Sequence, residues 1–165
     1  MPKQIVSFPP VIATHPRILI LGTMPGVISL QENQYYAHPK NAFWKILSTI
    51  NDIDCPTDYQ IKKQLIITMN LALWDVCHTC IRPGSADSNI REVEPNRIEE
   101  LLAAHPTIHT IIFNGKTAEK LFHRYLKIRD GIHSITLPST SPAYTLPFEK
   151  KLEAWRVVLQ SLKNR

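Results

Sequence analysis

The stretch from 17 to 50, RILILGTMPGVISLQENQYYAHPKNAFWKILSTI, contains the clearest fold signal in the chain. The run 17–21 is short and apolar and ends at Gly22, which is typical of a buried strand. Farther along, apolar residues recur at the spacing of an amphipathic helix with Pro39 in its first turn. These residues are Phe43, Ile46, Leu47 and Ile50. The chain is therefore expected to pass from a buried strand into a helix through a glycine turn.

The same alternation continues along the rest of the chain. Apolar, β-branched runs predict three more strands, at 71–76, 107–114 and 133–137. Helical patterns lie between them, at 57–70, 97–105, 115–127 and from about Pro147 onward. The polar, turn-rich segments 81–96 and 138–144 are expected to be loops. Alternating strands and helices imply βαβ crossovers, so the predicted fold is a three-layer α/β/α arrangement around a central, mainly parallel β-sheet.

Length and composition limit the class of protein. The 165 residues are 44% hydrophobic and 20% charged, as expected of one globular domain covering 1–165. No apolar run approaches the roughly 20 residues that span a bilayer, and the N-terminus lacks a signal-peptide pattern. We therefore expect a cytoplasmic monomer with no membrane partner. The net charge of +5 fits a polyanionic partner without requiring one.

Several familiar chemistries are not supported by the motifs. The three cysteines are too few for a four-ligand zinc or iron–sulfur site, so Cys77 and Cys80 are expected to be small buried residues. The GKT at 115–117 lacks the glycine of a phosphate-binding P-loop, because Thr110 stands at that position. No metal and no cofactor are expected.

Unusual loops follow the predicted strand ends, at 22–41, 74–89, 114–116 and 138–144. In parallel α/β folds ligands bind at this edge, so the four loops are expected to form one cleft. Asp75 and Asp87 could supply a carboxylate pair there, although the sequence does not set their separation.

One group of residues at that edge suits a planar ligand that forms hydrogen bonds. Gly22 and Gly26 allow close approach of the backbone, while Tyr35 and Tyr36 offer flat surfaces for stacking. Asn41 lies off the apolar stripe of the helix, where its amide could position water. The tyrosines could equally form a half-buried aromatic patch, and Asn41 could be an ordinary helix cap.

Three motifs together resemble the uracil-DNA glycosylase superfamily. They are GTMPG followed by YYAHPKNAFW, then FNGK, then LPSTSPA, and they extend from about 17 to 144. The resemblance is closest to the hypoxanthine-DNA (deoxyinosine) glycosylase branch. It implies a uracil-DNA glycosylase-like fold and a monofunctional enzyme, without cofactor or metal, whose partner is DNA containing a deaminated base. Met24 stands where most branches of the superfamily have Asp or Asn, and serines and a threonine replace the histidine of the last motif.

The resemblance also implies roles for particular residues. Asn41 is assigned the catalytic role. The base-binding residues are expected to be Gly22, Thr23, Met24, Tyr36, Trp74 and Asn114, with Trp74 placed at the pocket floor by its strand-end position. The DNA-binding residues are expected to be Lys116, Ser139, Thr140 and Ser141. Two alternatives remain: a mismatch-specific uracil/thymine-DNA glycosylase, and a non-catalytic nucleic-acid or nucleotide-binding module.

Overall fold

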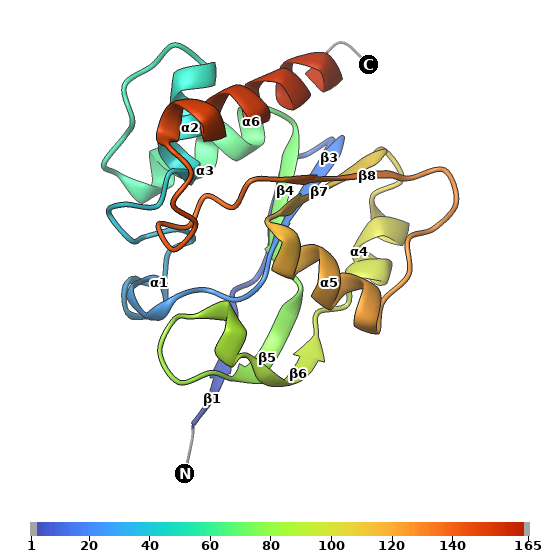
Figure 1. Ribbon diagram of the computed structural model, residues 1–165. Coiled ribbons are helices and arrows are strands. Elements are labelled where there is room, and N and C mark those ends of the chain that lie inside the picture. The colour runs from blue at the N-terminus through green and yellow to red at the C-terminus, as the bar shows by residue number, and fades with distance from the viewer. Residues whose placement is uncertain (1–2, 164–165) are drawn as a thin grey trace.

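The computed structural model describes residues 3–163 and has a five-stranded sheet at its centre (Figure 1). In spatial order the strands are β2 (Val11–Ile12), β4 (Leu71–Asp75), β3 (Ile18–Gly22), β7 (Thr110–Asn114) and β8 (His133–Leu137). Strand β3 runs parallel to both β4 and β7, and β7 runs parallel to β8. Only the short edge strand β2 is antiparallel to its neighbour. The predicted mainly parallel sheet is confirmed.

Helices cover both faces of this sheet. Helices α2 (Phe43–Ile50), α3 (Tyr59–Thr68) and α6 (Phe148–Lys163) lie on one face, and α4 (Ile98–Ala104) and α5 (Lys116–Tyr125) lie on the other (Figure 1). The short helix α1 (Val27–Glu32) follows β3. The three-layer α/β/α architecture is therefore confirmed. Within the described residues, no helix is long and apolar enough to cross a membrane.

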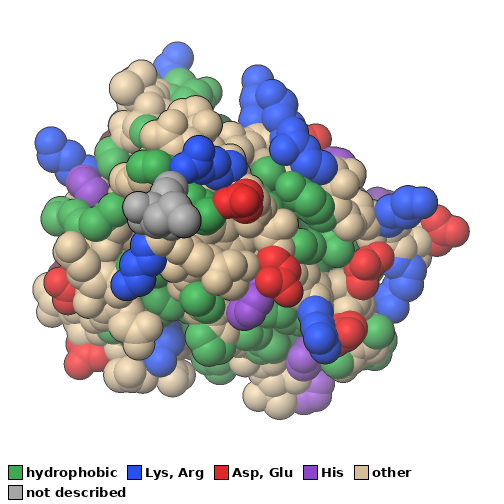
Figure 2. Space-filling model, turned by 90° about the horizontal axis from the view of Figure 1, so that it is seen from below, with side chains coloured by type: hydrophobic (Ala, Val, Ile, Leu, Met, Phe, Trp, Pro, Cys, Tyr) green, Lys and Arg blue, Asp and Glu red, His purple; other side chains and the backbone are tan. Residues whose placement is uncertain are grey.

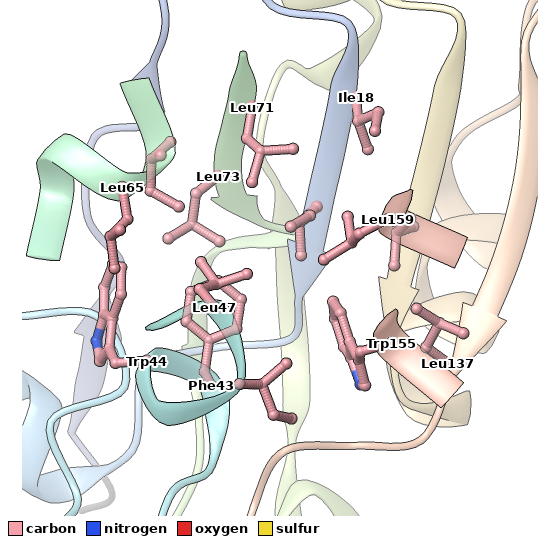
Figure 3. Close-up of a cluster of buried hydrophobic side chains, with 14 of the residues drawn as sticks. Ile18, Phe43, Trp44, Leu47, Leu65, Leu71, Leu73, Leu137, Trp155 and Leu159 are labelled. Carbon is pink, nitrogen blue, oxygen red and sulfur yellow. The ribbon is translucent and has the colours of Figure 1, made fainter. Parts of the chain in front are cut away.

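Two cores form because alternate side chains of each strand enter opposite layers. Ile18 and Ile20 of β3 pack with α2, α3 and α6, while Leu19 packs with α4 and α5. Phe43 and Trp155 fill the centre of the first core, and both are fully buried (Figure 3). Truncating Phe43 to alanine is expected to cost about 3–5 kcal/mol. This packing fixes the start of α2, and with it the segment that precedes α2, against the sheet.

A second, antiparallel sheet contains strands that the sequence did not predict. Its order is β1 (Gln4–Val6), β5 (Cys77–Ile81) and β6 (Arg91–Pro95). The prediction of a loop over 81–96 was therefore wrong in part, because it contains β6 and a 3-10 turn, η1 (Asp87–Asn89). Strand β6 is mostly exposed and charged, and β1 has three residues, so neither gives an apolar run that the sequence could reveal. The two-residue strand β2 of the central sheet is too short for the same reason. The register of β5 shifts at bulges, which explains why Cys77 and Cys80 are both buried.

Helix α2 begins later than predicted. Pro39 lies in a turn before the helix, and the helix begins at Phe43. The amide oxygen of Asn41 accepts the N–H of Phe43 at 3.0 Å, a bond that supports the helix from outside its first turn. Asp58 caps α3, since its side chain accepts the N–H groups of Gln60 and Ile61.

Candidate active site

A cleft of about 1010 Å³ opens at the carboxyl edge of the central sheet. Its walls come from the loops that follow β3, β5, β7 and β8, from the end of β4 and from the segment before α2. The lining includes 22–29, Tyr36, His38, Asn41, Asp75, 85–87, 114–117 and 136–144. The prediction that the four unusual loops form one cleft is confirmed. Its volume is at the upper end of the range of small-ligand pockets.

Gly22 forms the most crowded point of the cleft. A Cβ atom at this position would lie 2.5 Å from Oδ1 of Asp75 and 2.8 Å from the hydroxyl oxygen of Tyr36. Both distances are shorter than a real Cβ tolerates, so only glycine fits without movement. The carboxyl group of Asp75 and the hydroxyl group of Tyr36 therefore converge on the end of β3.

Tyr36 adopts a strained backbone conformation at the cleft. Its φ of 54° lies in the left-handed region, which costs a non-glycine residue about 1–2 kcal/mol. The ring packs on Phe43 with centroids 4.3 Å apart, and this packing holds the strained residue in place. Burial, and secondly the charge of Asp75, raise the pKa of Tyr36, so the phenol stays neutral. The neighbouring Tyr35 lies in the core, where its hydroxyl donates to the carbonyl of Pro9.

Asn114 connects Tyr36 to the loop 138–144. Its Nδ2 donates to the hydroxyl of Tyr36 at 3.2 Å and to Oγ1 of Thr140 at 3.0 Å. Its Oδ1 accepts the N–H of Thr140 at 2.9 Å. Both amide hydrogens are thus engaged within the protein, and one lone pair of Oδ1 remains for a ligand. The structure places Asn114 in the cleft, and its predicted contact with a base stays a prediction.

Asn41 precedes the N-cap residue Ala42 of α2, and it both supports the start of the helix and lines the cleft. Its oxygen is held by the N–H of Phe43, and its backbone N–H donates to the carbonyl of His38. Among residues 3–163, no group accepts from the side-chain NH₂ of Asn41, which lines the cleft. This bond fixes the side chain and leaves the NH₂ donor for a ligand. Asn41 is therefore not the ordinary helix cap that the sequence allowed, and its catalytic role stays a prediction.

The loop that follows β8 presents its three hydroxyl residues differently. Thr140 is 1% exposed and accepts from Asn114, so it supports the loop from behind, and the predicted phosphate contact would require the loop to move. Ser139 and Ser141 are half-buried, and their hydroxyl oxygens accept backbone N–H groups within the loop. Lys116 is exposed at the start of α5 and lines the cleft.

Trp74 is not part of the cleft, which corrects the expectation that it forms the pocket floor. Its indole N–H donates to the carbonyl of Phe8 at 3.0 Å, and it packs against the second core. Side chains alternate along a strand, so Trp74 and Asp75 enter opposite layers and only one of them can face the cleft. Asp75 is the one that lines it.

Arg82 holds the turn of the first motif and was missed at the sequence level. This buried guanidinium donates to the carbonyls of Pro25 and Gly84, both at 2.7 Å, and to that of Met24 at 3.4 Å. Met24 and Thr23 are both buried and both line the cleft. Arg82 follows β5 in a segment that the sequence predicted to be a loop. A lone arginine in a turn-rich segment gives no sign that it is buried, so its role could not be predicted.

Asp75 and Asp87 both line the cleft. Asp75 is 3% exposed, whereas Asp87 lies at the exposed mouth and accepts from Oγ1 of Thr23 at 3.0 Å. Burial, and secondly the charge of Asp87, raise the pKa of Asp75 to about 7, against the lowering effect of Arg82. Although the residue is exposed overall, desolvation of its carboxyl group by the surrounding protein also raises the pKa of Asp87, and the bond from Thr23 and the charge of Arg82 oppose this. Asp75 is therefore poised to titrate near neutral pH.

Metal and thiol chemistry receive no support from the described part of the chain. No group of three or more His, Cys, Asp or Glu side chains there could hold a metal ion. Cys77 and Cys80 are buried free thiols, and burial raises the pKa of both. On the face seen in Figure 2, acidic side chains are interspersed with Lys and Arg, so the basic excess does not gather into a continuous patch there.

Fold and cleft together define an α/β protein with a cleft at the carboxyl edge of a mainly parallel sheet, lined by Tyr36 and by the side chains of Asn41 and Asn114. Comparison with known proteins gives the family. The family model described as uracil DNA glycosylase superfamily matches residues 9–163. The chain therefore belongs to the uracil-DNA glycosylase superfamily, and the resemblance found in its motifs is confirmed.

Two relatives from Methanosarcina species are similar over much of their length. A protein of Methanosarcina barkeri named hypoxanthine DNA glycosylase is 38% identical over 117 residues, which cover 70% of this chain and 73% of the relative. A protein of Methanosarcina acetivorans with the same name is 31% identical over 155 residues, covering 93% and 97%. A solution NMR structure of a candidate uracil DNA glycosylase from M. acetivorans has a TM-score of 0.81 at 30% identity and covers 98% of this chain and 99% of its own.

Proposed function

We propose that this protein is a monofunctional DNA glycosylase that excises hypoxanthine from deoxyinosine in DNA. The observation that carries the proposal is the cleft in which Gly22, Tyr36, Asn41 and Asp75 converge. The similarity to two proteins named hypoxanthine DNA glycosylase supports the choice of base.

The cleft suits a base that has left the DNA stack. A glycosylase must extrude its target nucleotide to reach the glycosidic bond. The ring of Tyr36, backed by Phe43, offers the stacking surface. The turn at 22–24 brings backbone close to the base edge, and the remaining lone pair of Asn114 Oδ1 can accept a hydrogen bond from hypoxanthine.

Cleavage of the bond between C1′ and N9 places positive charge on the sugar and negative charge on the base. Polar groups fixed where that charge develops lower the barrier. Asn41 is held by its bond to Phe43, and we assign to its amide the orientation of the attacking water or of the sugar. Water is the nucleophile in this scheme, so the product is an abasic site in an uncut strand.

Contacts to phosphate complete the proposal. Lys116, Ser139 and Ser141 lie at the rim of the cleft and would hold the strand on either side of the extruded nucleotide. A second groove of about 830 Å³ shares Tyr36 and Asn41 with the cleft. Three lysines that line this groove, Lys40, Lys45 and Lys62, could contact phosphates farther along the strand, whereas Lys151 is buried and donates to the carbonyl of Ser141. Such contacts make affinity fall as salt rises.

The test is to incubate the protein with oligonucleotides that carry deoxyinosine, deoxyuridine or deoxyxanthosine and then to cleave abasic sites with alkali. The proposal predicts cleavage of the deoxyinosine strand after alkali and none before it. Preferential cleavage at deoxyuridine opposite guanine would indicate a mismatch-specific enzyme instead. Binding without any base release would indicate a non-catalytic module.

A further inference from the structure

One acidic side chain in the cleft has an oxygen without a partner. Asp75 ends β4 and is 3% exposed, and no group among the described residues 3–163 donates to its Oδ2. Buried polar atoms almost always have hydrogen-bond partners, and leaving one unpaired costs free energy. The Oδ2 atom is itself buried, so an ionised Asp75 would leave a charged oxygen unpaired, which favours the protonated carboxyl group.

The position of this carboxyl group relative to Tyr36 is set by Gly22. The Oδ1 atom of Asp75 and the hydroxyl oxygen of Tyr36 lie within 2.5 Å and 2.8 Å of the point where a Gly22 side chain would begin. The carboxyl group of Asp75, which lines the cleft, therefore lies close to the hydroxyl end of the Tyr36 ring, where it can reach the edge of a base that stacks on that ring. An acid at the edge of a base can exchange a proton with a ring nitrogen.

The surroundings of Asp75 favour its neutral form. The titratable and charged groups that interact with it are Asp87, Arg82, Tyr35, Tyr36 and Cys77. Burial raises the pKa values of both tyrosines and of the thiol, so these three groups are uncharged at neutral pH. Of these groups, Asp87 and Arg82 are the two that carry a charge. Burial and the negative charge of Asp87 together raise the pKa of Asp75 by more than the positive charge of Arg82 lowers it.

We propose that Asp75 is the general acid of the excision reaction and donates its proton to N7 of the departing hypoxanthine. The inference rests on the proposed glycosylase function and deepens it. A positioned general acid typically contributes a rate factor of about 100 to 10,000. Because N7 exists in purines and not in uracil, this acid also selects deaminated purines over deaminated cytosine.

The atoms of the step balance without another reactant. The bond between C1′ and N9 breaks, and its electron pair stays with the base. The proton of Asp75 moves to N7, so hypoxanthine leaves as a neutral molecule with hydrogen on N1 and N7. Water adds to C1′ and releases one proton, which restores the carboxylic acid of Asp75 directly or through solvent.

The test measures single-turnover release of hypoxanthine from deoxyinosine DNA between about pH 5 and 9. The wild-type rate should be constant at low pH and fall about tenfold per pH unit above about 7, as the acid ionises. Asp75→Asn should be slower by about 100-fold or more at low pH and should lack this fall. Asp87→Asn removes a negative charge that raises the pKa of Asp75, so the fall should begin at lower pH. Asp130→Asn is the matched control, because Asp130 is exposed and outside the cleft.

A second substrate tests the acceptor atom. DNA containing 7-deaza-2′-deoxyinosine lacks N7, and the wild-type protein should excise its base at least 100-fold more slowly than hypoxanthine, or not at all. Equal wild-type rates on the two substrates would overturn the proposal. A wild-type rate for Asp75→Asn at low pH, or an unchanged alkaline fall in that variant, would overturn it too. In each case hypoxanthine is still released by the wild type, so the proposed function would stand, whereas no release by the wild type would refute both.

Discussion

Substitution of Gly22 by alanine should damage the site while leaving the fold in place. The added Cβ would lie 2.5 Å from Oδ1 of Asp75 and 2.8 Å from the hydroxyl oxygen of Tyr36, whereas ordinary contact begins at 3.4 Å. To restore ordinary contact, the carboxyl group must retreat by about 0.9 Å and the hydroxyl by about 0.6 Å. Both groups are confined, Asp75 by burial and Tyr36 by its packing on Phe43.

The size of the effect follows from these displacements. Overpacking of this kind costs about 1–3 kcal/mol of stability, and a misplacement of about 1 Å at a reacting centre can cost about 100-fold in rate. The measurements are single-turnover excision on deoxyinosine DNA and the melting temperature. Gly26→Ala is the steric control for folding, because its Cβ would meet nothing closer than Oγ of Ser85 at 3.5 Å. Excision by Gly22→Ala at the wild-type rate would refute the claim that Asp75 and Tyr36 act from where the structure places them.

Three further predictions concern single side chains. Asn41→Ala should slow excision by about 100-fold or more at saturating protein, since it removes one fixed polar group, and a wild-type rate in a folded variant would remove Asn41 from the reaction. Partial activity of Asn41→Asp would then assign the residue to the water, whereas a loss as deep as in Asn41→Ala would assign it to an N–H donor. Lys116→Ala should weaken DNA binding and lower the slope of log affinity against log salt by about one, while Lys120→Ala, exposed on the same helix but outside the cleft, should leave the slope unchanged. An unchanged slope for Lys116→Ala would show that Lys116 does not contact phosphate. The pKa of Asp75 is higher in the folded protein than in the unfolded chain, so protonation of Asp75 favours the folded state. This contribution to the free energy of unfolding is complete below the unfolded pKa, near pH 4, and is lost as the pH rises through about 7. Relative to Asp75→Asn, the wild type should therefore lose up to about 4 kcal/mol over that interval in melting experiments, and a constant difference would contradict a buried, titrating Asp75.

The layers of the fold could be predicted because each central strand has a strong apolar signal. Residues 18–21 are buried on both sides, so they appear as a continuous apolar run, and the helices beside them show one apolar face. Strand β6 could not be predicted, because it is an exposed edge strand with charged side chains. Its pairing with β5 is a long-range contact that leaves no local pattern in the sequence.

The site was predictable in position and only partly in its contacts. The strand-end rule located the cleft, and the motifs located Tyr36 and Asn41 within it. The motifs could not show that Asn114 donates its two amide hydrogens to Tyr36 and Thr140, because these bonds join segments far apart in the sequence. Whether Trp74 or Asp75 faces the cleft depends on which side of the sheet each alternate residue of β4 faces. That is fixed by Leu71 and Leu73, which pack into the first core.

The central claim is that the protein releases hypoxanthine from DNA by hydrolysis. The most direct measurement is mass spectrometric detection of the free base, with the strand analysed on a denaturing gel before and after alkali. We predict free hypoxanthine in an amount equal to the abasic sites formed, with the strand uncut until alkali is added. Absence of free hypoxanthine, or strand cleavage before alkali in step with base release, would contradict the account.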